Sequence, residues 1–343
     1  MKSKFYVLSL AFSFLLVTGC SSKETRSVNV TKQDTKIEAT KVVVENKKAN
    51  QDLFKSLKNY DINALKKSIL EGADINSLNS SGNTLLLAIA QSNNIDYDYL
   101  EYVLSLNPDL YIENQSSISE GVVIRGRNAG MLTDDPKMIT MLSEHGFDFN
   151  TVSSQGLIPL ALAVDTKSSS TVKAILDSGA NPNVRDKKGF SPLMLAIFKG
   201  DTNLIYLLIN EKADVNYTDS KGNPPLLYAV TEEIISALID SGANLYLETE
   251  DGKIVGDEIL MISIENNFIN IVTELINLNY NLNLVDSYGD TPLNLAVGKS
   301  NVAMVRLLIE NGANPNIKDK KGFTAFDIAA TKGNVLITNI LEK

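Results

Sequence analysis

Two segments of the chain, residues 184–216 and 284–316, are each 33 residues long and share one pattern of glycine, proline, leucine and asparagine. The glycine of the first turn repeats at the same step of 33 residues, at Gly156, Gly189 and Gly222. A fixed period of this length indicates stacked units that bury their apolar faces against one another. The sequence therefore predicts one elongated repeat domain rather than a single compact core.

Each unit has the pattern of two helices between turns. In the copy at 184–216, a turn ends at Gly189, Ser191 can cap a helix, and Pro192 takes its first position, where a missing N–H costs nothing. Apolar residues at helical spacing give both helices one face to bury. We expect an all-α solenoid of about nine stacked helix-turn-helix units with short β-hairpin-like turns, over residues 51–343.

The pattern D-x-x-G-x-[ST]-P-L, followed by A and then LL-x-x-G-A-x-x-N, resembles the ankyrin repeat. The resemblance implies a protein-binding role, with contacts from the hairpin tips and the exposed side of the first helix of each unit. The chain departs from the family pattern where the family has a structural histidine. The residues at those positions are Leu87, Ala161, Met194, Leu227, Asn294 and Asp327.

Three units depart from the regular length. The third, about 112–150, is degenerate, and the glycines of its segment EGVVIRGRNAG do not have the spacing of a phosphate-binding loop, so we expect a distorted first helix there. The sixth and seventh, about 217–283, are irregular. The sixth is short by about three residues between Ala229 and Leu238, so we expect its inter-helix turn to be clipped, and the seventh has about four extra residues around 252–258.

The N-terminal residues 1–19 have the pattern of a lipoprotein signal peptide. Lys2 and Lys4 precede an apolar run that is too short to span a membrane. The run ends in Val-Thr-Gly-Cys, which resembles a bacterial lipobox and implies cleavage before Cys20, the only cysteine, and its acylation, as with palmitate. Residues 20–50 follow as a lipidated cysteine and a disordered tether. We therefore expect a membrane-anchored lipoprotein of the cell envelope, on its periplasmic or cell-surface face.

Charge and composition limit the possible partners and chemistries. The chain has a net charge of −9. The repeat domain carries −14, the tether +3, and Lys2 and Lys4 of the signal peptide the remaining +2. Such an acidic domain disfavours nucleic acid and anionic lipid as partners. His145 is the only histidine, so a zinc cluster or a Cys–His or Ser-His-Asp arrangement is very hard to build, and we expect it to cap a helix end.

We therefore expect no enzyme activity, no catalytic residue, no metal or other cofactor and no small-molecule ligand. Carboxylates are plentiful, so an enzyme that uses carboxylates in an irregular repeat stays open as an alternative.

The expected function is binding of an unknown protein partner by a monomer through the concave face of the stack. Aromatic residues flanked by lysine and arginine suit a protein interface. The candidate residues are Arg185, Lys187, Phe190, Phe198, Lys199, Thr218, Ser220, Asn223, Tyr288, Asp290, Lys318, Lys320 and Phe323. An alternative is an inhibitor or immunity-type protein that neutralises one exported enzyme or toxin.

Overall fold

The structure, a computed structural model, describes residues 47–115, 117–119 and 122–342. The predicted signal peptide, the lipidation site Cys20 and the tether up to residue 46 lie outside the described residues. The first helix begins at Lys47, four residues before the expected start of the repeat domain. Within the described residues, no helix is long and apolar enough to cross a membrane.

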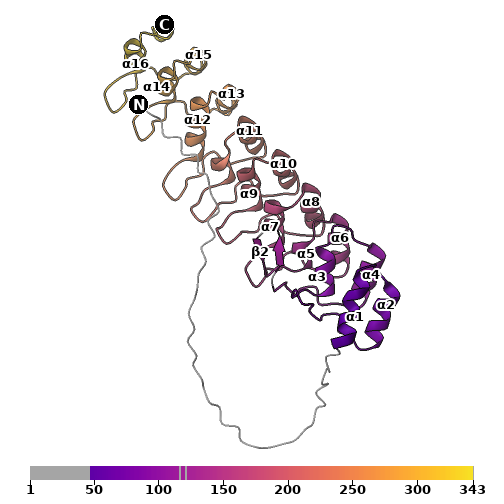
Figure 1. The fold of residues 1–343 in the computed structure, drawn as a ribbon. Coiled ribbons are helices and arrows are strands. Elements are labelled where there is room, and N and C mark those ends of the chain that lie inside the picture. The colour runs from indigo at the N-terminus through magenta and orange to yellow at the C-terminus, as the bar shows by residue number, and fades with distance from the viewer. Residues whose placement is uncertain (1–46, 116, 120–121, 343) are drawn as a thin grey trace, which may run out of the picture. The chain divides into compact units, whose positions relative to one another are not determined.

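Nine pairs of helices follow one another along the described residues, and we number them repeats 1 to 9 (Figure 1). The first helices are α1 (Lys47–Leu57), α3 (Leu85–Ala90), α5 (Ala129–Leu132), α7 (Pro159–Thr166), α9 (Pro192–Lys199), the 3₁₀ helix η1 (Pro225–Tyr228), α12 (Val255–Glu265), α14 (Pro292–Gly298) and α16 (Ala325–Thr331). The second helices are α2 (Ile62–Leu70), α4 (Tyr97–Ser105), α6 (Pro136–Glu144), α8 (Ser169–Asp177), α10 (Thr202–Asn210), α11 (Glu232–Asp240), α13 (Ile269–Asn277), α15 (Val302–Glu310) and α17 (Val335–Leu341).

The helices contact their own partner and the corresponding helices of the next repeats, so two rows of helices result, with hairpin turns projecting along one side (Figure 1). Buried apolar residues form one continuous core along these rows. The all-α repeat solenoid predicted from the sequence is confirmed. Its only strands within the described residues, apart from an isolated bridge, are β1 (Ser117–Ser119) and β2 (Val122–Ile124).

Repeat 5 shows why the sequence forms this unit. The Ser191 hydroxyl accepts a hydrogen bond from the Met194 N–H at 3.3 Å and so caps α9, with Pro192 at its first position. The preceding turn is closed by Asp186, whose carboxylate accepts two backbone N–H groups at 2.8 Å each. Gly189 completes this turn with a φ of +85°, a conformation that side chains with a Cβ rarely adopt.

Asparagines at the end of the repeats hold neighbouring units together. The Asn183 side-chain oxygen accepts the backbone N–H of Asp214 in the next repeat at 2.7 Å, and its nitrogen donates to the Lys212 carbonyl. Asn150, Asn216 and Asn283 make the same pair of contacts. Their step of 33 residues between Asn150, Asn183 and Asn216 therefore reflects a side-chain clamp between repeats.

The third repeat corrects one expectation. Its glycine-rich segment was expected to be a distorted helix, but it contains the strand β2, which pairs antiparallel with β1 just before the segment, with Ser117 opposite Ile124. The first helix that remains is the four-residue α5, capped by Asn128. Gly130 lies within this helix, where a Cβ would come within 3.0 Å of the Phe147 and Phe149 rings. The large aromatic residues of the following turn therefore fill the space beside a short helix.

The sixth and seventh repeats are irregular, as expected, and their first helices absorb the length changes. In repeat 6 the loss shortens the first helix to the four residues of η1 rather than trimming a turn. In repeat 7 the extra residues lengthen α12 to 11 residues instead of enlarging the preceding hairpin. Between these repeats Tyr246 replaces the clamping asparagine, and its ring stacks on Tyr280 with centroids 5.5 Å apart.

Candidate protein-binding face

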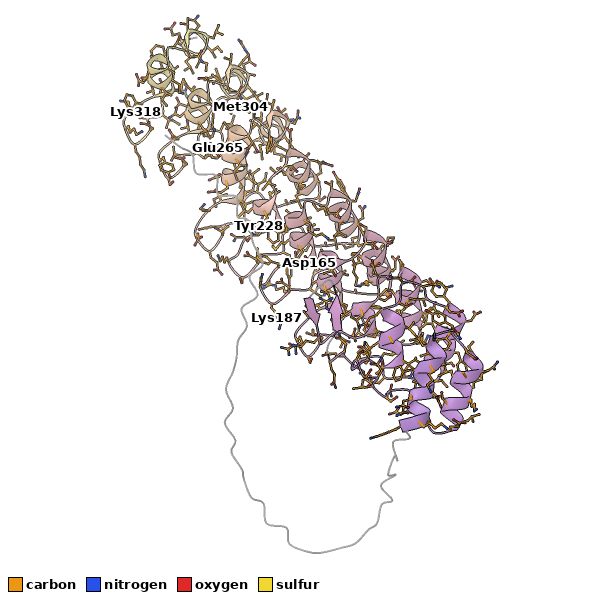
Figure 2. All side chains as sticks on the ribbon, viewed as in Figure 1. Asp165, Lys187, Tyr228, Glu265, Met304 and Lys318 are labelled. Carbon is orange, nitrogen blue, oxygen red and sulfur yellow. The ribbon has the colours of Figure 1, made fainter. Side chains whose placement is uncertain are left out.

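The candidate residues lie along the side of the stack that carries the hairpin turns and the exposed edge of the first helices, which we call the hairpin face. Figure 2 shows Lys187 and Lys318 on this side, where the hairpins of repeats 5 and 9 project. Tyr288 is 74% exposed at the tip of the repeat 8 hairpin. Large apolar groups at such tips are not needed for the core, so they are available for contacts with a partner.

Several of the predicted side chains have contacts within the stack. Arg185 donates to the Tyr217 hydroxyl at 2.8 Å and lies over its ring at 4.5 Å. Lys199 donates to the Val164 and Asp165 carbonyls at the end of α7. Lys199 therefore stabilises the end of the preceding first helix, which is the favourable place for a cation.

The other predicted tip residues connect neighbouring hairpins or are open to solvent. Lys187 packs over the turn glycine Gly156 of the preceding repeat. Lys320 donates from its backbone to the Tyr288 carbonyl at 3.3 Å. The Ser220 hydroxyl lies at the outer limit of a hydrogen bond, 3.5 Å from the Lys188 carbonyl. Lys318 is exposed and Thr218 is half-buried. The tips are thus ordered by contacts from one repeat to the next.

Phe190, Phe198 and Asn223 come together on the hairpin face of repeats 5 and 6. The Phe198 ring packs edge-on against Phe190 at 5.0 Å and against Tyr228 at 4.9 Å. The Tyr228 hydroxyl donates to the Asp219 carboxylate and accepts from the Asn223 amide at 3.2 Å. Burial and the bond to Asp219 raise the pKa of Tyr228 to about 12, so this hydroxyl stays protonated.

Tyr228 is a face residue that the sequence analysis missed. It occupies the position of Leu195 in repeat 5, three residues after the helix-starting proline, so an alignment of the repeats with one another would have placed it. Phe198 remains 42% exposed beside it. The cluster of Phe190, Phe198 and Tyr228 is therefore a partly exposed aromatic surface with a fixed shape.

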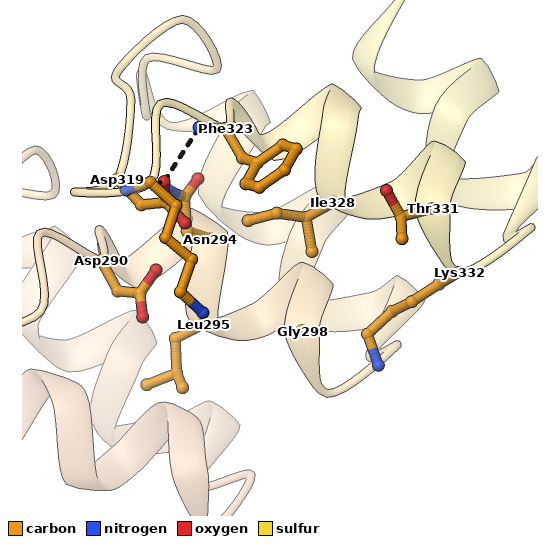
Figure 3. Close-up of a pocket in the computed structure, with 10 residues that line it drawn as sticks. Asp290, Asn294, Leu295, Gly298, Asp319, Phe323, Ile328, Thr331 and Lys332 are labelled. Carbon is orange, nitrogen blue, oxygen red and sulfur yellow. Dashed lines mark hydrogen bonds between the residues drawn. The ribbon is translucent and has the colours of Figure 1, made fainter.

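Asp290 and Phe323 both line a cavity of about 320 Å³ between repeats 8 and 9 (Figure 3). Leu295, Ile328 and the Phe323 ring, which is 45% exposed, supply its apolar walls. Burial first, and then the carboxylates of Asp286 and Asp319, raise the pKa of Asp290 above its ordinary value. The sequence analysis placed Asp290 and Phe323 on the face but did not predict a cavity between them.

No group of three or more histidine, cysteine, aspartate or glutamate side chains within the described residues could hold a metal ion. The His145 Nδ1–H donates a hydrogen bond to the Met141 carbonyl at 2.9 Å, at the end of α6. This is the helix-end role expected for it. Paired helices, hairpin turns and one ordered face with exposed aromatic residues thus define a helical repeat scaffold for binding.

Comparisons with known proteins agree with this geometry. The family model for ankyrin repeats in three copies matches residues 160–249 and again 250–343, which together exceed half of the chain. An ankyrin repeat domain from Acinetobacter baumannii AYE is 32% identical over 54% of this chain and 96% of that chain, with a TM-score of 0.47. The ankyrin repeat protein EF0377 is 30% identical over the same shares, with a TM-score of 0.46.

A complex of the predatory endopeptidase Bd0816 from Bdellovibrio bacteriovorus with its immunity protein Bd3460 also contains a similar chain. That match is 25% identical over 53% of this chain and 96% of that chain, with a TM-score of 0.41. A comparison with curated proteins gave no match. Because the family model covers more than half of it, the chain belongs to the ankyrin repeat family. Ankyrin repeats are scaffolds for protein–protein interaction, and this chain carries such a scaffold.

Proposed function

We propose that this chain is an exported ankyrin repeat lipoprotein, anchored in a membrane through acylated Cys20, that binds a protein partner through the hairpin face. The observation that carries the proposal is the row of large aromatic side chains exposed along this face, where the core does not need them. Phe198, Tyr288 and Phe323 are 42%, 74% and 45% exposed, although each lies within an ordered repeat. Aromatic residues of this kind are enriched among the residues that dominate binding energy.

The charge distribution supports a tethered binding module. The repeat domain is acidic and the tether mildly basic, so the domain is repelled by anionic lipid and stays in solution beside the membrane. The lipobox-like end of the N-terminal apolar run supports acylation of Cys20. An acyl chain there would anchor the protein, because each buried methylene adds about 0.8 kcal/mol of membrane affinity. The bound partner is then a protein of the cell envelope or one that enters it.

The test is capture of partners from envelope extracts by the full chain and by a variant carrying Tyr288→Ser and Phe323→Ser. We expect the variant to capture at least tenfold less of the principal partner, because loss of one residue that dominates binding costs about 2 kcal/mol or more. Leu278→Ser is the matched control, because Leu278 is an exposed apolar residue at the end of the second helix α13, away from the hairpins.

The controls separate binding from folding and from export. Helix content of each variant, measured by circular dichroism, should equal that of the parent. If the double variant keeps full capture while Leu278→Ser loses it, binding is on the second-helix side and the proposed face is wrong. For the anchor, Cys20→Ala should move the protein from the membrane fraction to the soluble fraction, and a variant that stays in the membrane would contradict lipidation. The identity of the captured protein decides whether the function is inhibition of one exported enzyme.

A further inference from the structure

The cavity between repeats 8 and 9 exists because a ring present elsewhere in the chain is absent here. Gly298 stands six residues after the helix-starting proline, at the position of Phe198 in repeat 5, and Asp290 stands at the position of Phe190. In repeats 5 and 6 the Phe198 ring fills the space between Phe190 and Tyr228. With glycine at this position, the equivalent space opens as a cavity of about 320 Å³.

Two polar side chains of this cavity, Asn294 and Asp290, have groups without hydrogen-bond partners within the described residues. The Asn294 side-chain nitrogen is buried without a hydrogen-bond partner among the described residues, and the residue is 3% exposed. No hydrogen bond or ion pair to the Asp290 carboxylate forms within those residues either, although its backbone N–H donates to Asp286. Figure 3 shows Asn294 on the side of the cavity where Asp290 and Asp319 lie.

The hydrogen-bonding capacity of the Asp290 carboxylate and the Asn294 amide nitrogen defines the kind of group that would satisfy both of them. An ionised carboxylate only accepts and an amide NH₂ only donates, so the occupant must donate to Asp290 and accept from Asn294. A guanidinium or ammonium only donates and would leave the Asn294 nitrogen unpaired. A carboxylate only accepts and would be repelled by Asp290. A hydroxyl does both.

The walls require that this hydroxyl be carried by an apolar ring. Leu295, Ile328 and the Phe323 ring line the cavity, while Lys321 and Lys332 are exposed at its rim. The volume is near the lower end of the range for ligand pockets, about 300–1,000 Å³, so it suits a single side chain. A serine or threonine hydroxyl would leave the apolar walls uncovered.

The chain itself contains a precedent for such a contact. In repeat 6 the Tyr228 hydroxyl donates to Asp219 and accepts from the Asn223 amide, with the tyrosine ring against Phe198. Asp219 and Asn223 are four residues apart, as are Asp290 and Asn294. The two pairs stand at different positions of the repeat, so the precedent concerns the chemistry and not the register.

We propose that the cavity lined by Asp290, Asn294 and Gly298 binds a tyrosine side chain of the protein partner. The inference rests on the proposed function, because it names the group that the hairpin face would hold. The partner's ring enters the space that Gly298 leaves empty and packs against Phe323. Its hydroxyl bridges Asp290 and Asn294, which removes two unpaired polar groups from a half-buried site.

The probe for this site is N-acetyl-tyrosinamide, added at millimolar concentrations to the ¹⁵N-labelled full chain and followed by amide chemical shifts. We expect shifts in residues 290–298 and 319–332 and not in repeat 5. N-acetyl-phenylalaninamide should bind about tenfold more weakly, because it lacks the bond to a charged group. N-acetyl-argininamide should bind more weakly as well, and tighter binding of the arginine compound would overturn the assignment.

Three variants sharpen the test. Gly298→Phe should abolish the shifts by placing in the cavity the ring that repeat 5 carries, and a Cβ at Gly298 meets nothing within 4 Å. Asn294→Met introduces the residue that repeat 5 has at this position, so it should fold, still bind the ring, and lose the preference for tyrosine over phenylalanine. Glu265→Gln changes an exposed carboxylate of repeat 7 and should leave binding unchanged. Unchanged tyrosinamide binding by both cavity variants would refute the proposal.

Partner capture distinguishes failure of this inference from failure of the proposed function. If Tyr288→Ser with Phe323→Ser lowers capture but Gly298→Phe does not, the face binds the partner without using the cavity. If none of these variants lowers capture, the face itself is wrong. If Gly298→Phe lowers capture about as strongly as the double variant, while helix content is unchanged, the cavity is a principal contact.

Discussion

Two glycines of repeat 8 have almost the same backbone conformation but different surroundings, so their alanine variants separate two energetic costs. Gly289 has a φ of +80° and Gly312 a φ of +91°. A Cβ on Gly312 would meet nothing within 4 Å, whereas a Cβ on Gly289 would lie 2.7 Å from the backbone nitrogen of Lys320 in repeat 9. Gly312→Ala therefore adds backbone strain alone, and Gly289→Ala adds strain and a clash with the next repeat.

The size of each effect follows from these contacts. A left-handed conformation costs an L-residue about 1–2 kcal/mol, which is the destabilisation expected for Gly312→Ala. The clash at Gly289 involves a backbone atom that no rotamer change can move away, and overpacking of this kind costs about 1–3 kcal/mol more. We therefore expect Gly289→Ala to destabilise its surroundings by about 2–5 kcal/mol in total.

Hydrogen exchange measured by mass spectrometry is the suitable assay, because long repeat arrays do not always unfold in a single cooperative step. Peptides from residues 286–298 and 319–332 report on repeats 8 and 9, and peptides from 62–105 serve as a distant reference. Contacts between nearest neighbours predict faster exchange in repeats 8 and 9 with little change in the reference. Equal losses of protection from exchange in the two variants would show that the close approach of the hairpins does not contribute to stability. Equal acceleration in the distant reference would contradict linear stacking.

Three further predictions concern other contacts. Asn183→Ala removes the clamp on the Asp214 N–H and should lower the stability of repeats 4 and 5 by about 1–2 kcal/mol, measured by exchange of the same kind. Gly256→Ala would place a Cβ 2.4 Å from the Tyr280 hydroxyl, so it should displace this ring and lower the unfolding midpoint, with a change in near-ultraviolet circular dichroism. Burial lowers the pKa of Lys167 to about 8, from 10.5 in the unfolded chain, so between these values the unfolded chain binds more protons and folding becomes more favourable as pH rises. The free energy of unfolding of the parent should therefore rise from pH 8 to pH 10 by about 1–2 kcal/mol more than that of Lys167→Met, after allowance for solvent screening. Free energies of unfolding that change with pH in parallel in the two proteins would contradict this.

The regular parts of the fold followed from local residue chemistry. Ser191, Pro192 and Gly189 each have one strongly favoured place in a turn or at a helix start, so the unit they define could be predicted without a structure. The spacing of turn glycines was less informative for the irregular repeats. It gives the net length between turns but not the element that absorbs a change, so the loss in repeat 6 was assigned to its inter-helix turn, and the gain in repeat 7 could be placed only around 252–258.

The binding face was predictable in outline but not in its contacts. Phe190, Phe198 and Asp290 could be placed on it because the repeat pattern fixes their position in the unit. The ring contact of Phe198 with Tyr228 was not predicted, because the repeat pattern fixes the position of each residue within its unit but not which side chains meet across the repeat boundary. The cavity beside Gly298 was also hidden, since a glycine at that helical position has no unusual local signature. The cavity is recognised only by comparison with repeat 5, which has the Phe198 ring at the equivalent position.

The helix lengths show where this chain varies and where it stays constant. All second helices from α2 to α15 are nine residues long. The first helices range from the four residues of α5 and η1 to the 11 of α1 and α12. The second helices thus keep a constant length along most of the stack, and the irregular segments change the first helices beside the hairpin face instead. Variation on this side changes the shape and chemistry presented to a partner while the second helices keep their length, which is the distribution expected when binding is grafted on a repeat scaffold.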